Sequence, residues 1–195
     1  MMKIEIDAHD IDKIMLLLPS VPGKAKSSLK GALRRSGTAL RTTISRGIRA
    51  ESFLKARDVR AALGNLQMEE TDDGLTAEFR VASRPIPADH YRLRPNRITA
   101  RRGMRSISWP LTRYQVGPGE PLILPETGEL SNAFILKASR GRTYVQRTRG
   151  GHDLHRVYGP SVQYFSVFDR VQEPAFKRAL EIFEKRLIHE VERWL

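Results

Sequence analysis

Apolar residues recur at helical spacing in two long segments, one near each end of the chain. In the first segment they lie three, four or seven residues apart and form one stripe: Val21, Ala25, Leu29, Ala32, Leu33, Leu40, Ile44 and Ile48. This spacing predicts a long amphipathic helix. Ser20 and Pro22 suit its cap and its first turn. The small residues Ser36 and Gly37 interrupt the stripe and leave room for the close approach of another element.

The second helical segment follows Glu173-Pro174, where the proline suits a first turn. Its apolar positions again recur at steps of three and four: Phe176, Leu180, Phe183, Leu187, Val191 and Trp194. We expect Phe176, Leu180, Phe183, Leu187 and Val191 to dock this helix, either on the body of the protein or on a neighbouring subunit. Two shorter helices are predicted over 9–18 and 54–63.

Between the helical segments the pattern changes to alternation with a period of two, which is typical of strands with one buried face. Residues 66–81 predict one hairpin around Asp72-Asp73-Gly74, and residues 133–146 predict a second around Ser139-Arg140-Gly141-Arg142. Further strands are predicted near Ile4 and Ile6 and over 107–116. Residues 84–105 combine three prolines with many arginines and predict a long basic arm.

The order of helices, strands and a final helix predicts an α+β fold with an antiparallel sheet, extended loops or arms, and a C-terminal amphipathic helix. We interpret the chain as one domain over 1–195. It would contain a helical part at 8–63, a β part at 64–150 with the basic arm at 84–105, and a turn plus the last helix at 151–195.

Positive charge is concentrated in two regions. The net charge is +12; residues 20–60 hold 11 Lys and Arg against two Asp and Glu, and residues 84–160 hold 14 against five. Such a field attracts phosphates or acidic protein surfaces and repels copies of the same chain. Residues 161–195 are neutral overall, so the last helix is the expected contact surface for self-assembly. The residues predicted to contact an anionic partner are Arg97, Arg101, Arg102, Arg105, Arg140 and Arg142.

The sequence contains few residues arranged for catalysis. There is no Cys, no phosphate-binding loop and no nucleophile elbow. His152 and His155, with Asp153 between them, could hold a metal, but no third ligand is evident. We therefore predict no enzyme activity, no catalytic residue, no cofactor and no metal, with a nuclease based on His152 and His155 as a rival. No apolar run approaches the roughly 20 residues of a membrane span, and no signal peptide is evident, so synthesis in the cytoplasm is expected.

Seven segments of the chain form a recognisable series, in the order Phe53–Val59, Ile86-Pro87, Tyr91–Pro95, Asn132–Ile135, Val145–Arg147, Val157–Val162 and Phe183–Val191. Together these segments resemble the phage minor tail protein Z family, the tail-completion proteins of long-tailed phages. The chain departs from the family pattern at Asn132, where Gly is usual, and in a longer insertion over 117–130.

The resemblance implies a structural protein of the virion that completes the head-proximal end of the tail tube for head–tail joining, made in the host cytoplasm. It implies a homo-oligomeric ring and other tail and neck proteins as partners. The positive charge of the chain would also allow non-specific contact with DNA. A basic nucleic-acid-binding protein remains the alternative function.

Overall fold

The computed structural model describes residues 2–7, 22–71, 74–96, 112–126, 128–130, 133–138 and 141–192. It confirms the predicted α+β fold, with a long N-terminal helix, small antiparallel sheets and a C-terminal helix. The predicted helix at 9–18, the turn residues Asp72 and Asp73, and the predicted strand positions 107–111 lie outside the described residues.

The chain forms two compact units. Unit 1 consists of residues 1–47, 59–82 and 166–195, and unit 2 consists of residues 48–58 and 83–165. The predicted parts followed each other along the chain, whereas each unit combines segments that are distant in sequence. The last helix belongs to the same unit as the long first helix and the first hairpin.

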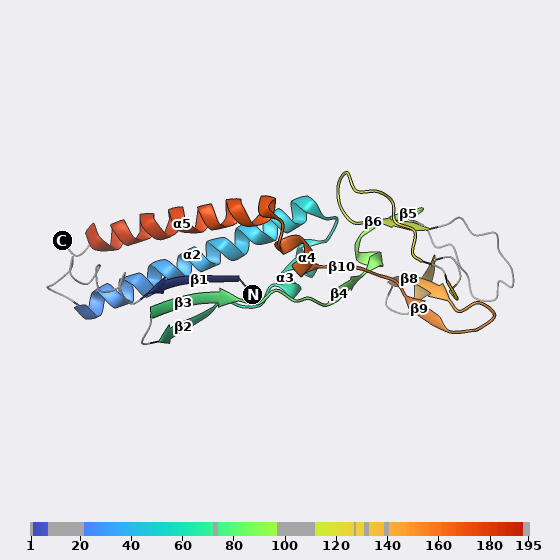
Figure 1. Ribbon diagram of the computed structural model, residues 1–195, viewed down its shortest axis with the longest axis horizontal. Helices are drawn as coiled ribbons and strands as arrows, with labels where there is room; N and C mark the ends of the chain where they lie inside the picture. Colours follow the sequence, from blue (N-terminus) through green and yellow to red (C-terminus); the bar gives the residue numbers. More distant parts are fainter. Residues whose placement is uncertain are drawn as a thin grey trace. The chain divides into compact units, whose positions relative to one another are not determined.

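Unit 1 contains a three-stranded antiparallel sheet with the order β1-β3-β2 (Figure 1). The strands are β1 (Met2–Asp7), β2 (Gln67–Thr71) and β3 (Gly74–Phe79). Ala77 of the central strand lies opposite Ile4 of β1 and Met68 of β2. The first hairpin and the strand predicted near Ile4 and Ile6 are confirmed.

The long helix α2 (Pro22–Glu51) packs against this sheet through its apolar stripe. Leu29 and Leu33 form a buried cluster with Leu75 and Ala77 of β3. Gly37 has no side chain, and a Cβ built there would lie 2.8 Å from Cδ1 of Leu66 and 3.3 Å from Cβ of Ala77. The close approach predicted at this position is therefore present, and its partner is the sheet.

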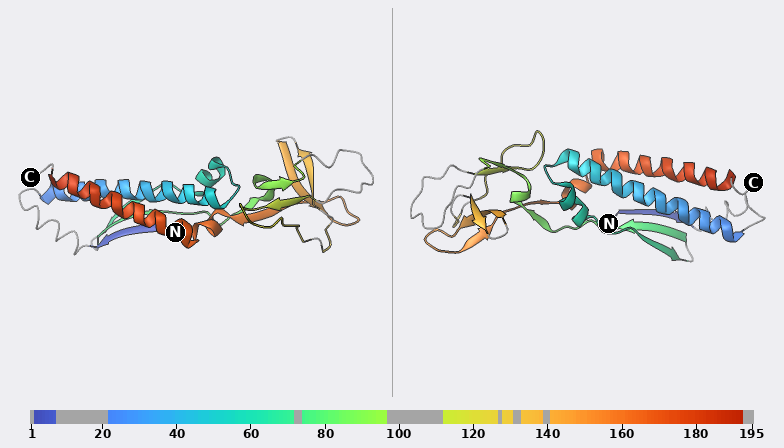
Figure 2. Two further views of the ribbon diagram at one scale, coloured as in Figure 1. Left: turned by 90° about the horizontal axis from the view of Figure 1, so that it is seen from above. Right: turned by 180° about the vertical axis from the view of Figure 1, so that it is seen from behind.

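The last helix, α5 (Asp169–Glu192), runs antiparallel to α2 along its side (Figures 1 and 2). Three contacts show this direction. Gly47 lies against Val171, and Ser36 Oγ donates a 2.7 Å hydrogen bond to the carbonyl of Ala179. Further along, Phe183 and Leu187 pack on the cluster that includes Leu29. Residue numbers fall along one helix as they rise along the other.

The predicted start of the last helix is wrong by about one turn. The backbone amides of Val171 and Gln172 donate to the carbonyl of Phe168, at 2.8 and 2.9 Å, so the helix already begins at Asp169. Pro174 consequently lies inside the helix rather than in its first turn.

Unit 2 contains three small antiparallel sheets with the orders β10-β4, β5-β6 and β7-β8-β9. Their strands are β4 (Pro85–Pro87), β5 (Arg92–Arg94), β6 (Arg113–Gln115), β7 (Phe134–Ala138), β8 (Gly141–Arg147), β9 (Leu154–Arg156) and β10 (Tyr158–Ser161). Short helical pieces are η1 (Ala88–His90) and α4 (Val162–Ser166), and α3 (Ala56–Ala62) begins in unit 2 and continues into unit 1 from Val59. The second predicted hairpin is confirmed as β7–β8.

The prediction of a long loop or arm at 84–105 is wrong for residues 85–94. Residues 85–94 form β4, η1 and β5, and Ala88, Tyr91 and Leu93 are buried. The prolines do not prevent this, because β4 is a three-residue strand that pairs only with β10, an edge position that proline tolerates. Residues 97–105 lie outside the described residues.

Candidate interaction surfaces

Helix α5 has an inner face of small side chains and an outer edge of large ones. Val171, Ala175 and Ala179 are at most 2 % exposed and face α2, where Ser36 and Gly47 allow the two helices to approach closely. Small residues in facing positions on the two helices therefore set their separation.

The predicted docking stripe of α5 is divided between these two surfaces. Phe183 and Leu187 pack on the core of unit 1, as expected for docking on the body of the protein. Phe176 and Leu180 are 39 % and 59 % exposed, so the body of unit 1 does not cover them, and their docking on a neighbouring subunit stays a prediction. The side chain of Val191 lies outside the described residues.

We call Phe176, Leu180 and Ile188 the outer edge of α5. Ile188 is 57 % exposed and was not singled out from the sequence. The edge lies among charged side chains of both signs, including the exposed pair of Arg178 and Glu181 at 3.0 Å. Large exposed apolar side chains on a regular element are typical of an interaction surface.

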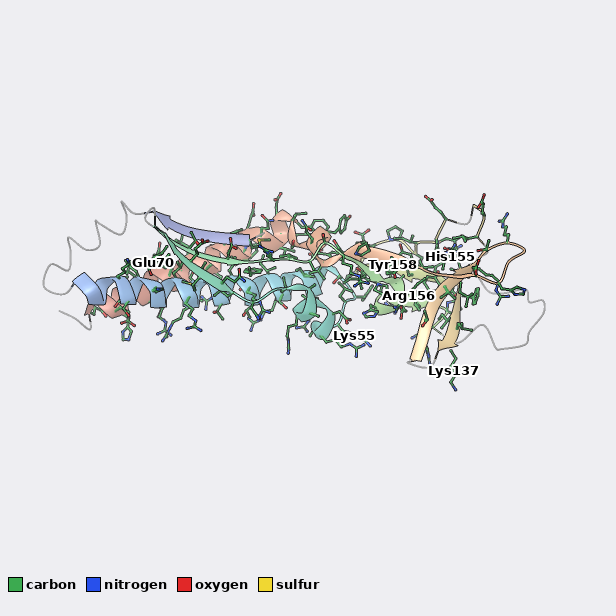
Figure 3. The ribbon with its side chains drawn as sticks, turned by 90° about the horizontal axis from the view of Figure 1, so that it is seen from below. Lys55, Glu70, Lys137, His155, Arg156 and Tyr158 are labelled. Carbon is green, nitrogen blue, oxygen red and sulfur yellow. The ribbon has the colours of Figure 1, made fainter. Side chains whose placement is uncertain are left out.

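The solvent side of α2 is strongly cationic. The helix holds eight Lys and Arg against one Glu. Arg41 donates to the backbone carbonyls of Leu63 and Gly64, and Lys26 and Lys30 both pair with Glu70 of β2, which Figure 3 labels beside α2. The remaining exposed arginines, for which the described part of the chain supplies no partner, are Arg34, Arg35, Arg46 and Arg49.

Unit 2 places cations directly opposite one another on paired strands. Arg94 of β5 is the register partner of Arg113 of β6, and both are exposed. Lys137 of β7 is the register partner of Arg142 of β8, and Figure 3 shows Lys137 projecting from this hairpin. We call these the two cation pairs. No carboxylate in the described ranges forms an ion pair with Arg94, Arg113 or Lys137.

Of the arginines predicted to meet an anion, Arg142 alone is described. Its Nη1 donates at 3.2 Å to both the backbone carbonyl and the side-chain oxygen of Asn96, just beyond β5. Arg97, Arg101, Arg102, Arg105 and Arg140 lie outside the described residues. Arg94 falls within the predicted basic arm, whereas Arg113 and Lys137 were missed, because strand register is not visible in the local sequence.

Tyr91, Tyr114 and Tyr144 of unit 2 form a buried aromatic cluster, whereas Tyr158 and Tyr164 are 48 % and 53 % exposed. Tyr114 lies 6.4 Å from Tyr91 and 6.3 Å from Tyr144 between ring centroids. The Tyr91 hydroxyl donates to the carbonyl of Pro160 at 2.6 Å, and the Tyr144 hydroxyl donates to the carbonyl of Thr112. Burial raises the pKa of all three tyrosines. The cluster is part of the framework that holds β6 and β8.

Among the described histidines, His90 forms a half-buried pair with Asp58, and His152 and His155 are exposed at and just before β9. His90 Nδ1 lies 3.1 Å from Asp58 Oδ1, a pair that their separation in sequence concealed, and the other Asp58 oxygen is buried without a hydrogen bond in the described structure. His152 and His155 are exposed, and His155 Nε2 lies 3.1 Å from Thr148 Oγ1. Across the described ranges, no three His, Asp or Glu side chains gather to hold a metal ion.

Comparisons with protein families, with curated proteins and with solved structures gave no match to this chain. None of the helices in the described ranges combines the length and the apolar character needed to cross a membrane.

Proposed function

We propose that this chain is a structural component of a phage tail, a tail-completion protein at the head-proximal end of the tail tube, which acts by binding protein neighbours. The tail assignment comes from the resemblance, which follows the chain in order from residue 53 to residue 191. The α+β fold, with its long first helix, antiparallel sheets and final helix, agrees with the layout that this resemblance implies.

The observation that carries the proposal is the outer edge of α5. The inner face of this helix is already occupied by α2, yet Leu180 and Ile188 each remain more than half exposed. Exposing such side chains is unfavourable in water, by about 25 cal/mol for each Å² of apolar surface. A protein neighbour on this edge would recover that free energy.

We assign this neighbour as a second copy of the chain, because of the distribution of charge. Helix α5 holds five Lys and Arg against six Asp and Glu, whereas α2 holds eight against one. Two copies that meet through α2 would bring two strongly cationic helices together, whereas a contact through α5 brings together helices with nearly balanced charge. A contact between the outer edges of two copies closes a dimer, whereas a ring is built when this edge contacts a different surface of the next copy and the rotation closes.

Replacing Leu180 with Glu tests the surface. We expect Leu180→Glu to weaken self-association by roughly thirtyfold, since removing a central interface side chain costs about 2 kcal/mol. The matched control is Lys185→Gln, which makes the same change of one charge at an exposed position of α5 without removing apolar surface. Light scattering across a concentration series measures the association, and circular dichroism reports the fold.

An equal effect of both substitutions, or no association of the native chain, would contradict the assigned interface. The tail role is tested separately by adding gold-labelled protein to purified tail tubes and imaging them by electron microscopy. Label at one tip of each tube is expected. Label along the whole tube, or none, would refute the tail assignment.

A further inference from the structure

Facing cations on paired strands are energetically unfavourable in an isolated protein. Side chains directly opposite each other in an antiparallel pair have Cβ atoms about 4.5–5.5 Å apart, and like charges at this spacing repel. Unit 2 contains two such arrangements, Arg94 opposite Arg113 and Lys137 opposite Arg142. An anion bound between the members of each pair would convert the repulsion into attraction.

The first cation pair belongs to a wider basic face. On β5, Leu93 is buried and its neighbours Arg92 and Arg94 are exposed, so these two arginines project from one face of the sheet together with Arg113. Arg92 is held in position because its guanidinium lies 5.4 Å from the centre of the Phe53 ring. Three guanidinium groups are thus presented on one side of a two-stranded sheet.

The second cation pair is anchored near the first. The side chain of Arg142 is fixed by its two hydrogen bonds to Asn96, which follows β5 by two residues. Tyr144 of β8 packs edge-on against Tyr114 of β6, the residue next to Arg113. Because Tyr114 is buried and Arg113 is exposed, this contact joins the two small sheets within unit 2 through the face of β6 opposite Arg113.

We propose that these cations form a binding surface for the phosphate backbone of a nucleic acid. Four of the five side chains are arginines (Arg92, Arg94, Arg113 and Arg142), whose planar fork matches the oxygens of a phosphate. A nucleic-acid backbone carries a charge on every nucleotide, so it can neutralise both cation pairs without any matching of sequence. The three tyrosines that pack between these strands, Tyr91, Tyr114 and Tyr144, are buried, so the cation pairs themselves contact charge rather than bases. This inference does not depend on the tail assignment.

Removing the first cation pair should weaken binding of DNA without lowering stability. A purely structural role for these arginines would not produce these two effects together. In the double variant Arg94→Gln with Arg113→Gln, the melting temperature should stay unchanged or rise, because the repulsion is relieved. Binding of a fluorescent DNA duplex of arbitrary sequence, measured by anisotropy, should weaken roughly tenfold at about 0.05 M salt. The slope of log K against log salt should fall in magnitude by about two, one for each lost phosphate contact.

The matched control is the double variant Arg34→Gln with Arg35→Gln. It makes the same change of two charges on exposed arginines of α2, in unit 1, and should weaken binding by no more than about twofold. Lys137→Gln is the second test variant, because it removes one cation of the other pair and leaves the bonds between Arg142 and Asn96 intact. It should weaken binding and lower the slope by about one.

Equal losses in the test and control double variants would overturn the proposal, since net charge alone would then explain binding. No salt-dependent binding of the duplex by the native chain would also overturn it. Binding of polyglutamate but not of the duplex by the native chain would overturn the proposal too, because the partner would then be an acidic protein.

Discussion

At the scale of single residues, Glu70 shows how the cationic helix is tied to the sheet. Its carboxylate, at the end of β2, pairs with Lys26 and with Lys30 on successive turns of α2. The hydrogen bonds from Lys26 and then Lys30 lower the pKa of Glu70 from an ordinary value of 4.5 to about 2. The ionised form is therefore favoured in the folded state.

This shift predicts a pH-dependent contribution to stability. Because the pKa is lower in the folded than in the unfolded state, the contribution is complete above about pH 4.5 and disappears as the pH falls toward 2. Glu70→Gln should lower the melting temperature slightly at pH 7 and leave it unchanged near pH 2. Thermal unfolding of both proteins at each pH measures the difference. A difference that persists at pH 2, or an equal effect of Glu69→Gln on the adjacent exposed residue, would contradict this account.

At the scale of elements, α2 packs closely on both of its neighbours because its interior contains small residues. Gly37 allows the sheet to approach, and Ser36 and Gly47 allow α5 to approach. Glycine within a helix is unfavourable by up to about 1 kcal/mol relative to alanine, so close packing must compensate for it. Another glycine of α2, Gly31, is exposed, and no heavy atom beyond its own helix and chain neighbours lies within 4 Å of a Cβ built there.

Alanine substitution should separate these two situations. Gly31→Ala should stabilise the protein by up to about 1 kcal/mol, since only helix propensity changes. Gly37→Ala should destabilise it by about 1–3 kcal/mol, because the added methyl group would collide with Leu66 and approach Ala77. Denaturant unfolding measures both changes. Equal stabilisation by the two substitutions would show that the sheet moves away without cost.

At the scale of the whole molecule, a net charge of +12 acts on the two proposed surfaces in opposite directions. Association through the outer edge of α5 brings together two cationic chains and is opposed by their repulsion. Binding of a nucleic acid is favoured by the same field. Salt screens both effects, because the Debye length falls from about 30 Å at about 0.01 M to about 8 Å at about 0.15 M.

We therefore predict opposite salt dependences in one preparation. Raising the salt from about 0.01 M to about 0.15 M should strengthen self-association, measured by sedimentation, and weaken binding of a DNA duplex, measured by anisotropy. Dissociation of the oligomer on adding salt would show that its interface is ionic rather than the apolar outer edge of α5.

Much of the fold could be predicted because it depends on local periodicity. The apolar stripe of α2, the alternation around residues 66–81 and 133–146, and the order of elements were sufficient for the α+β class. The concentration of positive charge and the neutral last helix are also properties of the sequence alone. Each of these features is encoded by residues close together along the chain.

The tertiary structure alone decided which side chains meet across long separations. Spacing gave α5 a broad apolar stripe, but contact with Ser36 and Gly47 selected Val171 and Ala179 for the inner face and left Leu180 on the outer edge. Strand register placed Arg94 opposite Arg113, a relationship that no local pattern records. Periodicity specifies the faces of an element, whereas the partner of each face is set by packing between elements distant in sequence.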